Sequence, residues 1–295
     1  MAPSPESKLR ADTHPETALR LIAAGCHADI LKYRAIVLKS ARPTGIHQTR
    51  VALRRLRAAF GLFRGAVHGP AVRALAAEAR WLARECGPAR DLQVFLTETV
   101  SDVPPLVRRV AGRLATIHLQ HARAALSGAR FAAFDRALAG FAARSPARAD
   151  GGGADGASDR LDAFGRRVLD VRLAKALRRG RKLQQFDPED LHRLRIAIKK
   201  LRYAATYFGA AFASAAAKPY IEATVRLQGA LGALNDRAVA AQVLADLATA
   251  ARPTEDVAKP LKALAKQVAS GEKRRRRRLE RAWKDFREVG RFWRA

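Results

Sequence analysis

The sequence pattern that decides the fold occurs twice, first as IHQTRVALRRLR at residues 46–57 and again as LHRLRIAIKKLR at residues 191–202. Both copies have the form His-x-x-Arg-x-Ala-x-basic-basic-Leu-Arg, and the second lies 145 residues after the first. The same offset relates further pairs outside the pattern, among them Pro43 and Pro188, Phe63 and Phe208, Leu82 and Leu227, Gly87 and Gly232, Asp91 and Asp236, and Val94 and Val239. A constant offset held without a gap over about fifty residues predicts a duplicated structural unit.

Each copy is predicted to form an amphipathic helix with one strongly basic face. Successive residues of a helix are separated by about 100° around its axis, so residues three and four apart share a face. In the first copy this places Arg50, Arg54 and Arg57 beside His47, with leucines and phenylalanines on the opposite side. The basic face of the second copy is formed by the equivalent residues His192, Arg195, Lys199 and Arg202. Arg55 and Lys200 fall beside these faces and are expected to point toward solvent.

A basic helix face can be an ordinary solvated surface or a binding site. Solvated faces usually mix charges of both signs, which support each other at i,i+4 spacing, but residues 46–64 contain no acid. Like charges three and four residues apart repel one another unless an anion lies between them. The pattern therefore favours an anion-binding face, while either histidine alone could be a packing or capping residue.

The composition predicts a folded all-α protein with a polyanionic partner. Hydrophobic residues make up 48% of the 295 residues, and no alternating Val/Ile/Thr runs bounded by turns indicate strands. The formal net charge is +29, which favours nucleic acid, an acidic membrane surface or a phosphate polymer as the partner. Arginine outnumbers lysine, and its planar guanidinium favours bidentate phosphate recognition.

Two cysteines, Cys26 and Cys86, lie in apolar helical contexts and suit buried thiols in a reducing compartment. The sequence contains no 18-residue apolar run that predicts a membrane span, and its first residues lack the apolar core of a signal peptide. We therefore expect a cytoplasmic protein.

The chain divides into four parts by composition and repeat. They are a disordered polar lead at residues 1–12, a first helical half at 13–144, a Gly- and Ala-rich linker at 145–158, and a second helical half at 159–295. In the first half a helix over 71–86 ends at Gly87-Pro88, and by analogy the second half is expected to have separate helices at 215–231 and 235–251.

The last predicted helix starts near residue 256 and contains five consecutive arginines at 274–278. Five residues in a row wrap around a helix, so most of these side chains are expected to face water. Trp283, Phe286, Phe292 and Trp293 are expected to anchor this terminal segment on the core.

With both copies considered, the chain resembles the CHAD family, the conserved histidine α-helical domain. The matching segments are the two basic helices together with Arg90-Asp91-Leu92-Gln93-Val94 and Leu231-Gly232-Ala233-Leu234-Asn235-Asp236. The resemblance covers about residues 13–295. It implies two helical-bundle halves related by pseudo-two-fold symmetry around a basic cavity that binds inorganic polyphosphate. It also implies association with polyphosphate granules in bacteria.

The resemblance assigns residues of this chain to two roles. The polyphosphate-binding residues it implies are His47, Arg50, Arg54, Arg55, Arg57, His192, Arg195, Lys199, Lys200 and Arg202. Supporting or orienting roles fall to Arg90, Asp91, Asn235 and Asp236. Gln93 stands where family members often have a second Asp, which weakens a metal-binding interpretation of this segment. No catalytic residue, metal site or cofactor is expected.

Two other functions are compatible with the charge. A nucleic-acid-binding protein is the first, although no helix-turn-helix, zinc finger or aromatic stacking platform is recognisable. A metal-dependent phosphohydrolase is the second, using His47, His192, Asp91 and Asp236. Against it, the basic helices carry no clustered carboxylates for Mg²⁺, and the sequence has no Walker loop.

Overall fold

The computed structural model describes residues 9–144, 160–185, 187–212 and 214–294. The first half comprises α1 (Pro15–Lys39), α2 (Pro43–Leu62), α3 (Pro70–Glu85), α4 (Gly87–Val94), α5 (Pro105–Ser127) and α6 (Ala129–Ala143). The second half comprises α7 (Leu161–Gly180), α8 (Pro188–Phe208), α9 (Ser214–Ala250), α10 (Ala258–Ala269) and α11 (Glu272–Glu288). These described residues contain no strand, which confirms the predicted all-α class. None of their helices is both long and apolar enough to cross a bilayer.

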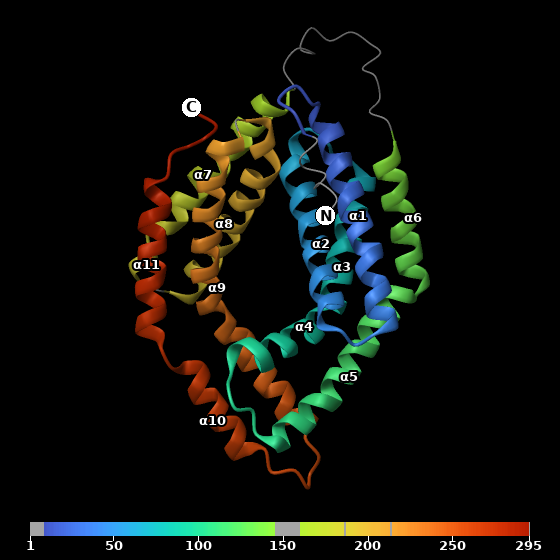
Figure 1. Ribbon diagram of the computed structural model, residues 1–295, viewed down its shortest axis with the longest axis vertical. Coiled ribbons are helices and arrows are strands. Elements are labelled where there is room, and N and C mark those ends of the chain that lie inside the picture. The colour runs from blue at the N-terminus through green and yellow to red at the C-terminus, as the bar shows by residue number, and fades with distance from the viewer. Residues whose placement is uncertain (1–8, 145–159, 186, 213, 295) are drawn as a thin grey trace.

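The helices form two bundles that stand side by side and meet at a common base (Figure 1). One bundle contains α1, α2, α3 and α6, and α1 packs mainly against α2. The other contains α7, α8, α11 and the first part of α9. The two basic helices, α2 and α8, pack against each other across the junction of the halves. The repeated sequence therefore lies on both sides of one interface.

Three phenylalanines join the two halves next to the C-terminal ends of the basic helices. Phe63 follows α2, Phe208 ends α8 and Phe164 comes from α7. The ring centroids of Phe63 and Phe208 are 5.2 Å apart, and Phe164 lies 5.6 Å from Phe63 and 5.8 Å from Phe208. Phe63 and Phe208 are equivalent in the repeat, so two equivalent residues contact each other, as occurs next to a two-fold axis. The predicted two-fold relation stays a prediction for the halves as a whole.

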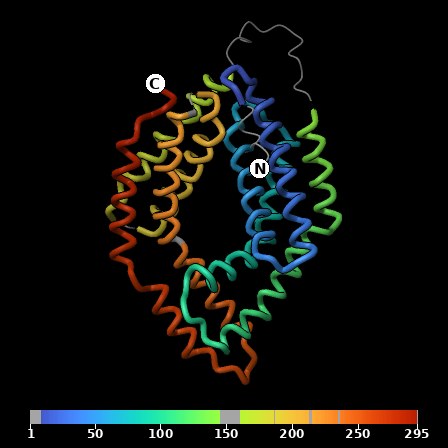
Figure 2. The backbone as a smooth tube through the Cα atoms, viewed as in Figure 1, coloured from blue at the N-terminus to red at the C-terminus, as the bar shows by residue number. Residues whose placement is uncertain are grey.

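A second core joins the halves at the base. Here α4 and α5 of the first half pack on the end of α9, which also packs on α10 (Figure 2). The core buries apolar residues from both halves: Leu92, Phe95, Val107, Val110, Val243, Leu247 and Leu264. Because both cores are shared, neither half buries its apolar surface alone. The two predicted halves therefore form one packed unit.

The prediction of two separate helices at 215–231 and 235–251 is wrong, because α9 runs unbroken from Ser214 to Ala250. In the first half Pro88 follows Gly87, and a proline lacks the backbone N–H and clashes with the preceding helical turn. In the second half Ala233 follows Gly232, and nothing in this pair stops a helix. The replacement of the helix-breaking Pro88 by Ala233 at the equivalent position explains why the second-half equivalents of α3 and α4 form one continuous helix, α9.

The predicted disordered lead at residues 1–12 is wrong for residues 9–12. Leu9 is fully buried in the main core, and the amide of Asp162 donates to the carbonyl oxygen of Ala11 at 3.2 Å. An apolar anchor and a backbone contact to the second half thus hold this segment in place. Residues 1–8 and the predicted linker at 145–158 lie outside the described residues. At the other end Phe286, Phe292 and Trp293 are buried, as expected for the anchor of the terminal segment.

Candidate polyanion-binding site

A cavity of about 650 Å³ lies between the halves and is lined by the basic faces of both repeated helices. Helix α2 contributes His47, Arg50, Arg54 and Arg57 to its wall. Helix α8 contributes Arg195 and Lys199, the equivalents of Arg50 and Arg54. The other charged lining residues are Arg84 of α3, Arg90 and Asp91 of α4, and Asp236 of α9. Six of the predicted binding residues therefore meet in one concave site.

Packing of the apolar faces turns these basic faces toward each other. Leu53 and Leu56 of α2 and Ile198 and Leu201 of α8 have no exposed surface. Each helix can bury that face only against its own bundle, so its basic face is left at the junction between bundles. Tyr207 of α8 strengthens the junction, since its hydroxyl donates to the carbonyl oxygen of Arg55 at 2.8 Å.

Arg50 is held in place by the end of α3 and by α4. Its Nη1 donates to the carbonyl oxygen of Ala83 at 2.7 Å, and its Nη2 lies 3.7 Å from the carboxylate of Asp91. A Cβ added to Gly87 would lie 3.2 Å from Nη1, so the absence of a side chain at Gly87 makes room for this arginine. Burial lowers the pKa of Arg50, although the Asp91 carboxylate opposes that effect.

Arg195, the equivalent of Arg50, is less completely paired. Its Nε is buried and has no hydrogen-bond partner among the described residues. A buried guanidinium N–H without an acceptor costs stability, and the cost is removed when an anion supplies an oxygen. The nearest acid in electrostatic terms is Asp236, whose pKa is raised by burial while Arg195 acts in the opposite direction.

Lys199 lies among four arginines and is the most perturbed cation of the site. Burial is the main cause that lowers its pKa to about 8, and the positive charges of Arg195, Arg54 and Arg57 lower it further. Arg54 is fixed beside it, because its Nε donates to the hydroxyl oxygen of Tyr203 at 3.0 Å. The cavity thus contains a lysine whose charge is easily lost near neutral to alkaline pH unless an anion stabilises it.

The two repeated histidines occupy different environments. His47 is half-buried in the cavity wall, and burial together with Arg90 and Arg54 lowers its pKa. His192 is exposed on α8 and does not line the cavity. The sequence predicted equal roles for the pair, whereas the structure brings only His47 to the shared site.

A second basic cavity, of about 770 Å³, adjoins the first. Arg54, Arg57 and Lys199 line both, so the two form a continuous basic surface along α2 and α8. Lys200, predicted to point off the stripe, lines this second cavity. Its further basic lining residues are Arg64, Arg80, Arg167 and Arg172.

Besides His192, two predicted binding residues, Arg55 and Arg202, lie in neither cavity. Arg55 donates from Nη1 to the carboxylate of Asp29 in α1 at 3.0 Å. Arg202 donates from Nε to the side-chain oxygen of Gln228 in α9 at 2.7 Å, and its guanidinium stacks over Tyr203. Both arginines therefore connect their helix to a neighbour within its own half.

Two of the four predicted supporting residues, Asp91 and Asp236, are acids that interact with arginines of the cavity. Asp91 lies beside Arg50, while Arg90 forms an ion pair of 2.9 Å with Glu98. Burial raises the pKa of both Asp91 and Asp236. In the described part of the chain no group of three or more His, Cys, Asp or Glu residues is placed to hold a metal ion. Asn235 is part of α9, but its side chain lies outside the described residues.

The basic lining from α3 and α7 was not predicted. Arg80 and Arg84 of α3 share one helix face at i,i+4 spacing, and this spacing was the available signal. Arg167 and Arg172 of α7 have no such regularity. Their place beside α8 follows from bundle packing, which the sequence of α7 alone does not encode.

The fold and the cavity define an all-α protein with a basic site between two repeated halves. Residues 21–245 match the CHAD domain family, and the chain belongs to this family. The crystal structure of the CHAD domain from the plant Ricinus communis is similar, with a TM-score of 0.80 and 25% identity over 96% of this chain and 94% of that one.

A second solved structure, PptA from Streptomyces chartreusis, shares the fold with a TM-score of 0.61 and 17% identity. The match covers 94% of this chain and 98% of that chain. No curated protein sequence is significantly similar to this chain.

Proposed function

We propose that this protein binds inorganic polyphosphate in the cavity between α2 and α8, without catalysing a reaction of it. The observation that carries the proposal is the charge of the wall. Seven basic side chains line the cavity in addition to His47, and they face only two carboxylates, Asp91 and Asp236. They are Arg50, Arg54, Arg57, Arg84, Arg90, Arg195 and Lys199.

A flexible phosphate polymer fits the chemistry of this wall. It presents oxygen acceptors along its whole length, and guanidinium groups bind such oxygens through charge-assisted and often bidentate hydrogen bonds. The buried Nε of Arg195 has no hydrogen-bond partner among the described residues, and the pKa of Lys199 is lowered. A bound anion would stabilise both groups, because it supplies an acceptor to the first and a counter-charge to the second. Membership of the CHAD family supports the same ligand.

Binding without hydrolysis is supported by the positions of the acids. Asp91 lies beside Arg50, and Asp236 is in electrostatic contact with Arg195. These positions support an orienting role for both carboxylates. We further propose that the protein acts in the cytoplasm at polyphosphate granules, where such a ligand is concentrated.

Titration of long-chain polyphosphate into wild type and into the double variant Arg50→Ala/Arg195→Ala tests the site. We expect loss of tight binding with unchanged helicity by circular dichroism. The matched control is Arg55→Ala/Arg202→Ala, which removes two arginines from the same helices but outside both cavities. Equal losses in the two double variants would show that net charge alone binds the polymer.

Two further measurements separate the alternatives. Duplex DNA at equal phosphate concentration should not displace polyphosphate from the wild type, and displacement would favour a nucleic-acid-binding protein. Incubation of polyphosphate with the protein and Mg²⁺ or Mn²⁺ should release no orthophosphate. Release that is lost in His47→Ala or Asp91→Asn would make the protein a phosphohydrolase.

A further inference from the structure

The outer surface of α11 carries a second concentration of arginine, remote from the cavity. Helix α11 lies at the edge of the molecule and packs on α9 through Leu279, Ala282 and Phe286, which are buried (Figure 1). No residue of α11 lines either basic cavity. The five arginines of residues 274–278 therefore need a separate explanation.

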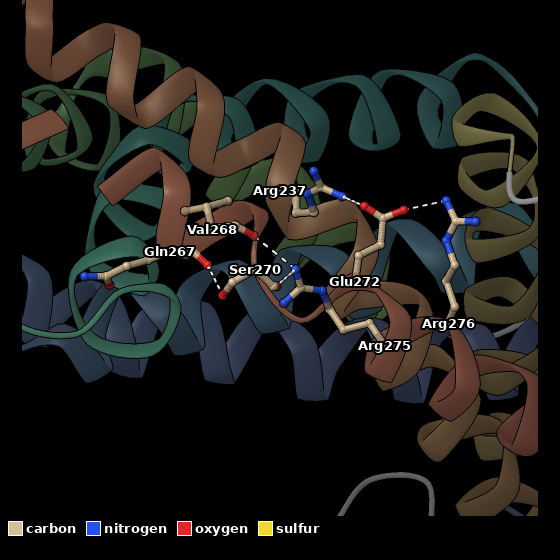
Figure 3. Close-up of polar contacts among 7 residues, drawn as sticks. All are labelled: Arg237, Gln267, Val268, Ser270, Glu272, Arg275 and Arg276. Carbon is tan, nitrogen blue, oxygen red and sulfur yellow. Dashed lines mark hydrogen bonds and ion pairs between the residues drawn. The ribbon is translucent and has the colours of Figure 1, made fainter. Parts of the chain in front are cut away.

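Two of the five have structural roles at the junction of α10 and α11 (Figure 3). Arg275 donates from Nη2 to the carbonyl oxygen of Val268 at 3.0 Å and to that of Ser270, which satisfies carbonyl groups at the end of α10. Arg276 forms an ion pair with Glu272, whose other oxygen accepts from Arg237 of α9 at 2.6 Å. These two arginines fasten the start of α11.

The other three share one face with a fourth arginine one turn further on. Arg274, Arg277, Arg278 and Arg281 have the spacing i, i+3, i+4 and i+7, which places them together on the side of α11 away from its buried residues. All four are exposed. Within the described residues none of their side chains forms a hydrogen bond or an ion pair. We call these four residues the outer arginine face.

We propose that the outer arginine face is a second binding surface for inorganic polyphosphate, separate from the cavity. Its four guanidinium groups are spread over roughly 10 Å of helix length, at about 1.5 Å per residue. A flexible polyanion can follow such a stripe and relieve the repulsion between like charges four residues apart. The choice of polyphosphate as the ligand rests on the function proposed for the cavity.

The aromatic residues of α11 argue against single-stranded nucleic acid on this face. Trp283 points inward, and a Cβ added to Gly180 of α7 would lie 2.1 Å from its ring. Phe286 is buried. No aromatic ring of the helix is thus available beside the arginines to stack on unpaired bases, which is the usual means of binding them. A phosphate polymer without bases requires no such ring.

A protein with two polyphosphate surfaces can hold two segments of one long chain or bridge two chains. Engagement of both surfaces by one molecule raises the apparent affinity for long polymers above that of either surface alone. A chain too short to reach from one surface to the other should gain nothing. The outer arginine face should therefore matter for long polyphosphate and not for short polyphosphate.

The test replaces Arg274, Arg277, Arg278 and Arg281 together by Gln, which has a helix propensity close to that of Arg. A matched control replaces four exposed basic residues of the first half by Gln: Lys39, Arg109, Arg136 and Arg144. Both variants are made in wild type and in the Arg50→Ala/Arg195→Ala background. Binding of long-chain polyphosphate, of tripolyphosphate and of duplex DNA is then titrated at several salt concentrations.

Without the cavity substitutions, we expect the α11 variant to bind long polyphosphate chains about tenfold more weakly than wild type does and to keep the wild-type affinity for tripolyphosphate. By analogy with single-stranded nucleic acid, the slope of log K against log salt should fall by about three, from four lost contacts. In the cavity-variant background, the α11 replacement should remove the remaining long-chain binding.

Equal losses in the α11 variant and in the matched control would overturn the proposal, as would unchanged long-chain binding in both backgrounds. A loss confined to duplex DNA would also overturn it and would assign the surface to nucleic acid. Failure of the cavity proposal is distinguishable, because the Arg50→Ala/Arg195→Ala substitutions would then leave affinity unchanged both when the α11 arginines are present and when they are replaced.

Discussion

The two copies of the basic helix, α2 and α8, have the same pattern but do not serve the cavity equally. All four residues of the predicted α2 face line it, whereas α8 contributes only Arg195 and Lys199. His192 is exposed and Arg202 is bonded to Gln228. The difference teaches that the duplicated pattern fixes the helix and its apolar face, while the neighbours of each copy decide which cations reach the cavity.

The N-terminal ends of α2 and α8 also differ, in their capping and in their charge. Helix α8 is capped by Asp187, whose carboxylate accepts from the amide of Asp190 at 2.9 Å, and Arg193 pairs with both acids of its first turn. Helix α2 has neither a side-chain cap nor an acid in its first turn. The start of α2 thus keeps its positive charge next to the cavity, whereas acids neutralise the start of α8.

The largest expected effect concerns the equivalent pair Arg54 and Lys199, which line both cavities. We expect Arg54→Ala and Lys199→Ala each to weaken polyphosphate binding by roughly tenfold to a hundredfold, the loss of one charge-assisted contact of about 1.5–3 kcal/mol. Isothermal titration calorimetry measures the change. If one variant bound normally, only one copy of the pattern would serve the ligand.

The second effect is a pH dependence that only the α8 member of this pair can produce. Lys199 has a pKa of about 8 and is charged below that pH, so its contact with the anion is complete below pH 8. As the pH rises through about 8 the free protein loses this charge, and affinity should fall.

Lys199→Arg tests this dependence, because arginine keeps its charge over the whole range. Titrations between pH 7 and 10 should show a fall in affinity for wild type and a flat profile for the variant. Proton uptake at pH 8.5, measured by calorimetry in buffers of different ionisation enthalpy, should disappear with the substitution. A profile that is equally steep in both proteins would assign the dependence to another group.

The third effect separates the two equivalent glycines. In Gly87→Ala the new methyl group would lie 3.2 Å from Nη1 of Arg50, whereas at Gly232 it would meet no atom within 4 Å. We expect Gly87→Ala to displace Arg50 and weaken binding several-fold. Gly232→Ala should leave binding unchanged and stabilise α9 by about 0.5–1 kcal/mol. Equal binding by the two variants would show that the position of Arg50 is not critical.

The smallest effect distinguishes the histidines. His47→Ala should weaken binding only a few-fold at pH 5.5, on the order of 0.5 kcal/mol, because a half-exposed charge contributes little. His192→Ala should have no effect, since that side chain lies outside both cavities. Because burial and nearby arginines lower the pKa of His47, its contribution should vanish by neutral pH. A larger loss of affinity in His192→Ala than in His47→Ala would show that His192, and not His47, contributes to binding.

Much of the site could be predicted from the repeated pattern because helical periodicity is a local property. It identified Arg50, Arg54, Arg57, Arg195 and Lys199, which meet in the cavity. These positions required only that each helix bury its leucines. The all-α class followed from the same periodicity and is confirmed.

The remainder depends on contacts between distant segments. Whether Arg202 reaches the cavity depends on Gln228 of α9, and whether Arg55 does depends on Asp29 of α1. The arginines of α7 enter the second cavity through bundle packing. The continuity of α9 was missed for a different reason, since the repeat suggested a break that only Pro88 imposes on the first half.

The contact between Phe63 and Phe208 has a consequence for the origin of the chain. In an isologous dimer, residues near the axis lie against their own copies in the other subunit. A single ancestral half with this phenylalanine could therefore have assembled with an identical half before the gene was duplicated. Fusion then released the two copies from identity, so that one could retain its histidine toward the cavity while the other acquired an acidic helix start.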